Sequence, residues 1–379
     1  MGKVVVGAFS EHIQYLTLPG RNALYRQAIA SVIQPGDTVA DLGCGVGVLG
    51  LFCLEAGASH CWGIDSSDAI YLARESMERA GLANRYTSIA GSTFRTQLPE
   101  KVDLIICDHV GFMGFDYGII ALMRDGRRRF LKPGGQMIPQ ALELYAAPVM
   151  ADACRDLAAR WGNDLVPPEF RWLDAPNRNN RYSHNFTPED LLGEPSMLGR
   201  IDFAEDGPDF FRLGATFRIA RAGRFDGFAG WFDCQLAGDV RMTNSPLDPA
   251  SIQRPQAFFP ALESFPVEAG DEVRITLRFR ADDSMIAWTI QPPGGAPVHR
   301  LSTFNSTVLT PADLVKDPGR PLALNPLGAA RAYVLAQVDG QRSGEAIIAR
   351  VLEERPDLLP TEQAIRDFVK GVLVRDCSI

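Results

Sequence analysis

The chain has 379 residues, a length that accommodates two or three domains, each with a hydrophobic core of its own. With 46% hydrophobic and 22% charged residues, it has the composition of a folded protein rather than of a disordered one. A formal net charge of −8 gives no general attraction for nucleic acid or for an anionic membrane, so we expect neither as a partner.

The cysteines and histidines predict reduced thiols and no bound metal. Seven cysteines are scattered without a CxxC pair, and five histidines are dispersed, so neither residue type shows the spacing of a zinc site. An odd number of separate cysteines is typical of a reducing compartment. The chain begins without a signal-peptide pattern and has no apolar stretch long enough to span a bilayer, so we expect it in the cytoplasm.

A glycine-rich turn stands between a short apolar run and a helical pattern near the N-terminus. The run Thr38–Leu42 predicts a strand, the segment GCGVG follows it, and a helical pattern occupies 48–56. Glycines allow a ligand to approach the backbone, and the N-terminus of the next helix offers unpaired amides. This unit predicts a cofactor site, and by itself it also fits a dinucleotide-dependent enzyme.

Two further apolar runs end in aspartates. The run Cys61–Ile64 precedes Asp65, which stands where an acid receives the ribose hydroxyls of a nucleotide cofactor and also fits the cap of the next helix. The run Val102–Cys107 precedes Asp108, and the later segment FLKPGG predicts a helix end and a turn before another strand. Strands and helices that alternate in this way predict a doubly wound, largely parallel sheet with its site at the carboxyl ends of the strands.

Four segments in this order resemble class I S-adenosylmethionine-dependent methyltransferases, and within them the protein arginine methyltransferases. They read DLGCGVGVLGLFCLEAGA, GIDSSDAIYLA, GSTFRTQLPEKVDLIICDHVGF and FLKPGGQMIP. The resemblance implies a Rossmann-like domain at 37–142 that binds S-adenosyl-L-methionine, preceded by cofactor-covering helices at 1–36.

The resemblance also assigns cofactor contacts. The methionine and ribose parts fall to Asp41, Gly43, Cys44, Gly45, Asp65, Ser66 and Asp108. Arg21, in the segment RNALYR that resembles the family's N-terminal helix, would pair with the cofactor carboxylate, which a guanidinium matches with two hydrogen bonds. Phe94 aligns with the family's adenine-binding glutamate, so with Ser92 and Thr93 it implies an apolar or stacking contact to adenine.

The acceptor side departs from the family. The loop that carries its two guanidinium-binding glutamates corresponds to CDHVGFMGFDYG, where Asp108 replaces the first glutamate and Tyr117 the second, beside Asp116. Asp108 is the leading catalytic candidate because it closes a buried strand, and Asp108, His109 and Asp116 are the candidate bases for an acceptor that must lose a proton. Tyr117 completes the predicted catalytic set.

Three residues are predicted to contact the substrate. The family's Thr-His-Trp loop corresponds to SIQRPQAF, which puts Gln253 at or near the histidine position. His12 and Tyr15 lie on the predicted N-terminal cover and are expected to line the site.

The second half predicts an antiparallel β-barrel or sandwich at 143–300. The segments ELYAAPV, RLGATFRIA, GFAGWFDCQLA, DEVRITLRFR and MIAWTI have the alternating pattern of strands, and they match the barrel domain of the resembling family. An irregular insertion at about 152–202 corresponds to the family's dimerisation arm, so the resemblance implies a homodimer.

The C-terminal residues predict a small helical domain. A Pro- and Gly-rich linker is expected at 301–323, followed at 324–379 by apolar residues at helical spacing around a DG turn, with Ser343 as a helix cap. This part resembles PqqD-like domains, which are winged-helix-like modules that bind leader peptides.

The two resemblances together predict a methyltransferase of peptide or peptide-derived substrates in the biosynthesis of ribosomal natural products. Three alternatives stay open: a small-molecule N-, O- or C-methyltransferase of specialised metabolism, a protein arginine methyltransferase, and a non-catalytic cofactor-binding protein that activates another methyltransferase. The acceptor atom, which includes whether arginine is accepted, is not determined by the sequence.

Overall fold

The computed structural model describes residues 8–282, 285–306 and 323–377, and the chain forms two compact units, Met1–Thr307 and Val308–Ile379. Residues 307–322, most of the predicted linker, lie outside the described residues; its first residues, 301–306, complete a strand and a 3-10 turn of the first unit. Across the described ranges, no helix has the length and apolar character needed to cross a membrane.

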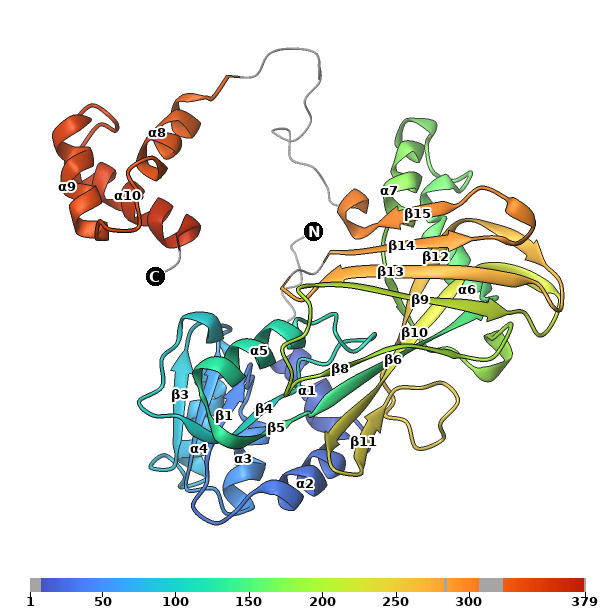
Figure 1. Ribbon diagram of the computed structural model, residues 1–379, viewed down its shortest axis with the longest axis horizontal. Helices are drawn as coiled ribbons and strands as arrows, with labels where there is room; N and C mark the ends of the chain where they lie inside the picture. The colour runs from blue at the N-terminus through green and yellow to red at the C-terminus, as the bar shows by residue number, and fades with distance from the viewer. Residues whose placement is uncertain (1–7, 283–284, 307–322, 378–379) are drawn as a thin grey trace. The chain divides into compact units, whose positions relative to one another are not determined.

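A five-stranded parallel sheet forms the first layer, in the order β3-β2-β1-β4-β5, with helices on both faces (Figure 1). Its strands are β1 (Thr38–Leu42), β2 (His60–Asp65), β3 (Tyr86–Ala90), β4 (Val102–Cys107) and β5 (Leu131–Ile138), and its helices are α3 (Val48–Glu55), α4 (Ala69–Arg79) and α5 (Ile119–Arg129). The predicted runs for β1, β2 and β4 are confirmed, because each is nearly continuous buried apolar sequence. The strand order reverses between β1 and β4, which puts the switch point of the sheet at their carboxyl ends.

The FLKPGG segment joins a helix end to a strand. The predicted helix end is confirmed, because α5 ends at Arg129 with Phe130 as its C-cap, but the predicted turn is wrong, because β5 begins at Leu131 and pairs with Val102 before its register shifts. The Pro133-Gly134 bulge absorbs that shift, with Gly134 in the left-handed region at φ 80°.

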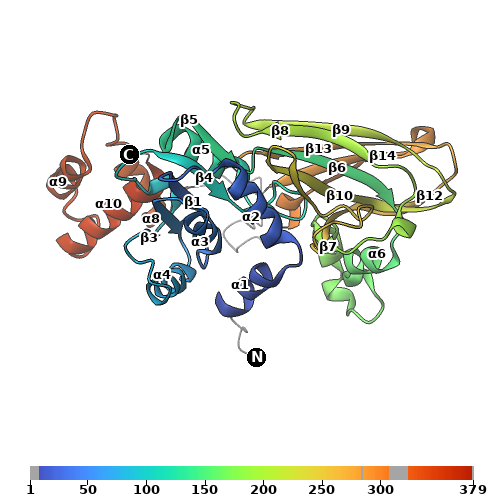
Figure 2. The ribbon, with the colours of Figure 1, turned by 90° about the horizontal axis from the view of Figure 1, so that it is seen from below.

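Two N-terminal helices, α1 (Ala8–Thr17) and α2 (Arg21–Val32), cover the sheet edge. α2 contacts α3 on one side and strands β10 and β11 on the other, so it lies between the parallel sheet and the β-rich layers (Figure 2). Tyr25, Ala28 and Ile29 on α2 have no exposed surface. Burial of these apolar side chains fixes the helix beside the site.

Two antiparallel sheets form the β-rich part of the first unit. The larger has the order β7-β12-β10-β6-β8, with β11 on β10, and the smaller has the order β15-β14-β13-β9. The strands are β6 (Ala141–Val149), β7 (Tyr182–His184), β8 (Ser196–Asp202), β9 (Phe210–Arg218), β10 (Gly223–Ala237), β11 (Val240–Thr243), β12 (Gln256–Val267), β13 (Glu272–Arg280), β14 (Ile286–Gln291) and β15 (His299–Ser302). The five predicted strand segments correspond to β6, β9, β10, β13 and β14.

The predicted insertion is helical in its first half. It contains α6 (Asp152–Ala158), the 3-10 turns η2 (Arg160–Gly162) and η3 (Pro168–Leu173), and α7 (Asp174–Arg178). Its predicted end at 202 is wrong, because Ser196–Asp202 forms β8 and pairs with β6 from Ala141 to Ala146. We call residues 152–178 the helical arm.

The C-terminal unit has three helices, α8 (Pro326–Leu335), α9 (Gly344–Glu354) and α10 (Glu362–Asp376). They enclose a separate core of Val334, Ile347, Ile348, Val351, Ile365, Val369 and Val372. The predicted cap is confirmed, since the Ser343 hydroxyl accepts a hydrogen bond from the Ala346 amide at 3.2 Å. Residues 323–377 contain no strand, so this range holds no wing of the predicted winged-helix-like domain.

Candidate functional site

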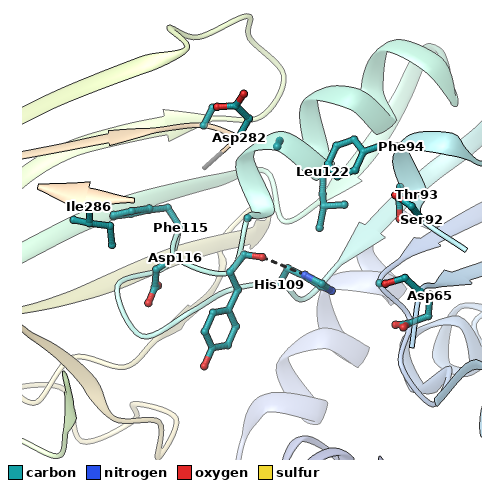
Figure 3. Close-up of a pocket in the computed structure, with 16 residues that line it drawn as sticks. Asp65, Ser92, Thr93, Phe94, His109, Phe115, Asp116, Leu122, Asp282 and Ile286 are labelled. Carbon is teal, nitrogen blue, oxygen red and sulfur yellow. Dashed lines mark hydrogen bonds between the residues drawn. The ribbon is translucent and has the colours of Figure 1, made fainter. Parts of the chain in front are cut away.

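The carboxyl ends of β1, β2 and β4 bring Gly43, Asp65 and Asp108 to one edge of the parallel sheet. Two cavities open there. One, of about 520 Å³, is lined by His12, Tyr15, Leu16, Arg21, Asp41, Gly43, Cys44, Gly45, Val46, Val48, Leu49, Asp65, Ser66, Ser67, Asp108, His109 and Tyr117, and we call it the N-terminal cavity. The other, of about 530 Å³, extends past Ser92, Thr93 and Phe94 to Ala281 and Ile286, and we call it the β-domain cavity (Figure 3). Both share Gly43, Asp65, Ser66, His109 and Tyr117.

The glycine turn after β1 has no room for side chains. Gly43 and Gly45 are in the left-handed region, at φ 66° and 55°. A Cβ on Gly43 would lie 1.9 Å from Nε2 of His109, and one on Gly45 would lie 2.9 Å from Cε1 of His12. The turn therefore presents bare backbone beneath two imidazoles, as a cofactor-binding turn requires.

Asp65 is held rigidly at the end of β2. One of its carboxylate oxygens accepts a hydrogen bond from the Gly45 amide at 2.8 Å, and the other accepts from the amide and the hydroxyl of Ser67, both at 2.7 Å. A carboxylate offers about four lone-pair directions, so these three bonds leave capacity for a ligand hydroxyl. The turn-anchoring role and the ribose role predicted for Asp65 are therefore compatible.

Asp41 is almost fully buried, with 1% of its surface exposed. Its carboxylate accepts a hydrogen bond from the Gly50 amide at 2.9 Å, which links β1 to the first turn of α3. Burial, only partly offset by that hydrogen bond, raises the pKa of Asp41 to about 7. This carboxyl group titrates near neutral pH.

Asp108 is the centre of a buried ion-pair cluster. Arg21 donates from Nε to Oδ2 of Asp108 at 2.5 Å, and the Tyr25 hydroxyl donates to Oδ1 at 2.8 Å. Burial and the Asp108 charge raise the pKa of Tyr25, so its hydroxyl remains a donor. Nη2 of Arg254 lies 3.9 Å from Oδ2. Both oxygens of the predicted catalytic carboxylate are thus engaged by groups of the chain itself.

The other members of the predicted catalytic set have separate environments. Asp116 has a 1% exposed side chain, accepts a hydrogen bond from the Met113 amide and forms an ion pair at 2.7 Å with Arg181. Nδ1 of His109 lies 3.3 Å from the Tyr117 carbonyl oxygen, and the imidazole extends toward Asp65 (Figure 3). Because a carbonyl oxygen only accepts, Nδ1 carries the proton, and in the neutral ring Nε2 keeps its lone pair.

The structure corrects the position of Gln253. Its side chain is exposed, whereas that of the next residue, Arg254, is 6% exposed, and neither residue lines either cavity. Arg254 donates to the Val110 carbonyl oxygen at 2.5 Å and lies over the ring of Tyr15, with 5.5 Å to the ring centroid. Sequence reasoning did not single out Arg254, because the polar segment SIQRPQ gives no local signal that this side chain is buried.

The remaining predicted site residues line one of the two cavities. His12, Tyr15 and Cys44 line the N-terminal cavity, while Ser92, Thr93 and the 52% exposed Phe94 line the β-domain cavity. Within the part of the chain that the structure describes, no three His, Cys, Asp or Glu residues are grouped to hold a metal ion.

Replacement of Asp41 by asparagine tests its titration. The folded-state pKa of about 7 lies above the ordinary aspartate pKa of 3.8, so the folded state binds the proton more tightly than the unfolded state. The resulting stability is fully present below the unfolded pKa and is lost as pH rises through the folded pKa. We expect the free energy of unfolding of the wild type, measured by urea denaturation, to fall relative to that of Asp41→Asn across this window. A difference that is independent of pH would contradict the assignment.

A model of the methyltransferase domain family matches residues 39–135 of the chain. A probable protein arginine N-methyltransferase 6 of Arabidopsis thaliana is 34% identical over 303 residues, which cover 77% of this chain and 67% of that protein. A probable protein arginine N-methyltransferase 6.2 of Oryza sativa subsp. indica is 28% identical over 230 residues, which cover 58% of each chain. The match therefore spans less than two thirds of the rice protein's length.

Solved structures share the fold. The enzyme–prozyme heterotetrameric PRMT1 complex of Trypanosoma brucei with AdoHcy aligns with a TM-score of 0.68 and 19% identity, covering 78% of this chain and 96% of that one. Arabidopsis thaliana protein arginine methyltransferase 10 aligns with a TM-score of 0.65 and 20% identity, covering 77% and 97%. From the extent and identity of the Arabidopsis sequence match, the chain belongs to the protein arginine N-methyltransferase family.

Proposed function

We propose that this chain is an S-adenosylmethionine-dependent methyltransferase that acts on a polypeptide. The observation that carries the proposal is the set of groups at the switch point: a bare glycine turn, the fixed carboxylate of Asp65 and the guanidinium of Arg21, all lining one cavity. The methyltransferase domain match covers this turn, and the structurally similar Trypanosoma complex is one with AdoHcy.

The residues present fit a cofactor with an amino-acid end and an adenosine end. Arg21 suits the carboxylate of the amino-acid end, and Asp41, when ionised, suits its ammonium group. Asp65 retains acceptor capacity for the ribose hydroxyls, and the exposed ring of Phe94 offers a face for adenine in the β-domain cavity. Bound there, the cofactor supplies an electrophilic methyl carbon.

The chain contributes position and exclusion of water. Helix α1 brings His12 over the glycine turn, which closes the N-terminal cavity from that side. Asp108 orients Arg21 and Tyr25 and is a positioning residue in this arrangement. Nε2 of His109 is the one predicted base whose lone pair stays unengaged, so a hydroxyl acceptor would lose its proton to this atom.

Substitution of Asp65 tests cofactor binding. Titration calorimetry with S-adenosylmethionine should detect binding to the wild-type chain, and Asp65→Ala should weaken it roughly 10- to 100-fold, because hydrogen bonds to a charged group contribute about 1.5–3 kcal/mol. Asp68→Ala is the control: Asp68 is exposed, makes no capping hydrogen bond and lines neither cavity. An unchanged affinity in Asp65→Ala, or no binding by wild type, would contradict the proposal.

The family favours a polypeptide as the methyl acceptor, but it does not identify the atom that is methylated. The relatives are named for protein arginine methylation, which makes arginine one candidate. The activator alternative predicts cofactor binding without turnover, and a radiolabelled methyl-transfer assay separates it from the enzyme.

We also propose a homodimer through the helical arm. Three large apolar side chains on this arm are exposed: Leu165 at 92%, Phe170 at 53% and Trp172 at 68%. Apolar groups of this size gathered on one segment indicate a surface that another protein covers, and a second copy is the occupant implied by the family resemblance.

Sedimentation of Trp172→Asp tests the dimer. We expect the wild-type chain to sediment as a dimer and the variant as a folded monomer, because a charge in an apolar interface must lose its hydration on association. Phe210→Asp is the matched control, since Phe210 is 56% exposed and lies outside the arm. A monomeric wild type or an unaffected Trp172→Asp would refute the interface.

The C-terminal unit supports a second candidate, recruitment of a peptide in ribosomal natural-product biosynthesis. A cavity of about 440 Å³ between α8 and α10 is lined by Leu327, Phe368 and Val372. Gly328 and Gly371 also line it, and because they have no side chains they leave room between the helices. Asn325, Arg331 and Arg375 complete its lining. An apolar floor with basic groups at its edge fits an amphipathic acidic peptide.

Leu327→Asp tests this recruitment. Leu327 is 59% exposed, so its substitution leaves the core of the unit intact. With labelled S-adenosylmethionine and the small-peptide fraction of the source organism, we expect the wild type to label peptides and the variant to label them several-fold more weakly at unchanged cofactor affinity. Val338→Asp, an apolar site of the same unit outside this cavity, is the control. Equal labelling by Leu327→Asp would remove the recruitment role.

A further inference from the structure

A buried tyrosine lies beneath the glycine turn, outside both cavities. Tyr86, at the start of β3, is 5% exposed, and it lines neither the N-terminal cavity nor the β-domain cavity. Its neighbour in the sheet is β2, where Tyr86 pairs with Cys61. The ring is therefore one strand away from Asp65, the carboxylate that fixes the turn.

Glycines occupy three positions around this ring. A Cβ on Gly63 of β2 would lie 1.9 Å from Oη of Tyr86, and one on Gly47, the N-cap of α3, would lie 2.9 Å from the same oxygen. A Cβ on Gly50, in the first turn of α3, would lie 2.6 Å from Cε2 of the ring. The ring thus fills a slot whose walls are β2, the glycine turn and α3.

Two of these glycines are required by space and not by backbone conformation. Gly47 has φ 82°, which favours glycine in any surroundings, whereas Gly50 lies within a helix and Gly63 within a strand. Glycine inside a helix or strand is destabilising by about 0.5–1 kcal/mol relative to alanine. A methyl group at either position would overlap the Tyr86 side chain, so the ring accounts for both glycines.

The slot joins the segments that carry the proposed cofactor groups. Gly63 lies two residues before the carboxylate at the end of β2, and the Gly50 amide donates to Asp41 at 2.9 Å. Cys44, in the turn itself, lines the N-terminal cavity, and its Sγ lies 3.0 Å from the Cβ position of Gly63, beside Oη of Tyr86. A change in the size of residue 86 is therefore transmitted to the turn and to the carboxylates of β1 and β2.

The shape of the Tyr86 ring, and not its hydroxyl group, fits it to this slot. Among the described residues the hydroxyl has no hydrogen-bond partner, and the nearby Cys44 thiol donates instead to the Gly45 carbonyl oxygen at 3.8 Å. A buried hydroxyl without a partner does not stabilise a fold. Packing of the ring against the three glycines is what remains to hold the turn.

We propose that Tyr86 is a positioning residue for the cofactor, whose ring sets the distance between the glycine turn and the end of β2. The proposal rests on the cofactor-binding function proposed above. A smaller side chain leaves a void into which the turn relaxes, so the Gly45 amide and the carboxylate of Asp65 no longer meet the ligand together. The affinity for the cofactor then falls, although no group that touches it has changed.

An exchange of size between residues 86 and 63 tests this role. In calorimetry with S-adenosylhomocysteine, we expect Tyr86→Val to bind about tenfold more weakly than wild type, a difference of about 1.4 kcal/mol. Gly63→Ala should also weaken binding, because its methyl group meets the ring. The double variant should bind roughly threefold more tightly than either single variant, since the added methyl group occupies part of the void. Tyr86→Phe, which keeps the ring, should stay within about twofold of wild type.

Phe130→Val is the matched control. Phe130 is 3% exposed, lines neither cavity and lies beside the amino end of β4, where its carbonyl oxygen accepts from the Val102 amide. Its replacement also creates a void, so the free energy of unfolding in urea should fall while the affinity for S-adenosylhomocysteine stays unchanged. A purely structural role for Tyr86 gives this same pattern. That pattern in Tyr86→Val, or a double variant that binds no better than the single ones, overturns the proposal.

A measurement on the wild-type side chain applies if Tyr86→Val does not fold. In protein labelled with 3-fluorotyrosine, Tyr86→Phe identifies the fluorine resonance of Tyr86. Saturation with S-adenosylhomocysteine should shift this resonance and leave in place that of Tyr145, which lies on β6 outside both cavities. An unshifted Tyr86 resonance overturns the proposal. Absence of binding to the wild-type chain would instead reject the proposed function, so the two failures are distinguishable.

Discussion

A buried ion pair between the first residue of α2 and the residue after β4 holds the cofactor edge and its cover together. Arg21 is 3% exposed, and the side chain of Asp108 is 7% exposed. Burial of two charges is costly, and the cost is offset here because Arg21 reaches Asp108 through two nitrogens while Tyr25 satisfies the other oxygen. Loss of either partner would leave an uncompensated buried charge, at about 3–5 kcal/mol.

The same pair ties the acceptor chemistry to the fold. The carboxylate that a guanidinium substrate would need is the one that anchors α2, and α2 in turn packs against α3, β10 and β11. A change in the partners of Asp108 therefore affects the stability of the edge at which α2 meets the glycine turn.

Sequence patterns predicted the strands and the glycine turn of the parallel sheet well because local rules govern them. Buried runs, a glycine turn with positive φ and an aspartate at the end of β2 each follow from a few neighbouring residues. The strand β12 was missed, since Gln256–Pro260 is buried on both faces instead of alternating and the strand contains two prolines, Pro260 and Pro266. The choice of Arg254 over Gln253 was also out of reach, because contacts distant in sequence decide it.

Asn244 shows how those distant contacts set the acceptor side. It is fully buried, accepts from the Phe232 amide at 3.0 Å, and donates to the carbonyl oxygens of Phe112 and Pro255, both at 2.9 Å. One side chain thus joins the acceptor loop after β4, strand β10 and the residue that follows Arg254. The glycine turn and Asp65 are positioned within one βαβ unit, whereas the loop after β4 is positioned where three separate segments meet. Substrate specificity can therefore change through residues of the β-rich domain while the cofactor turn remains as it is.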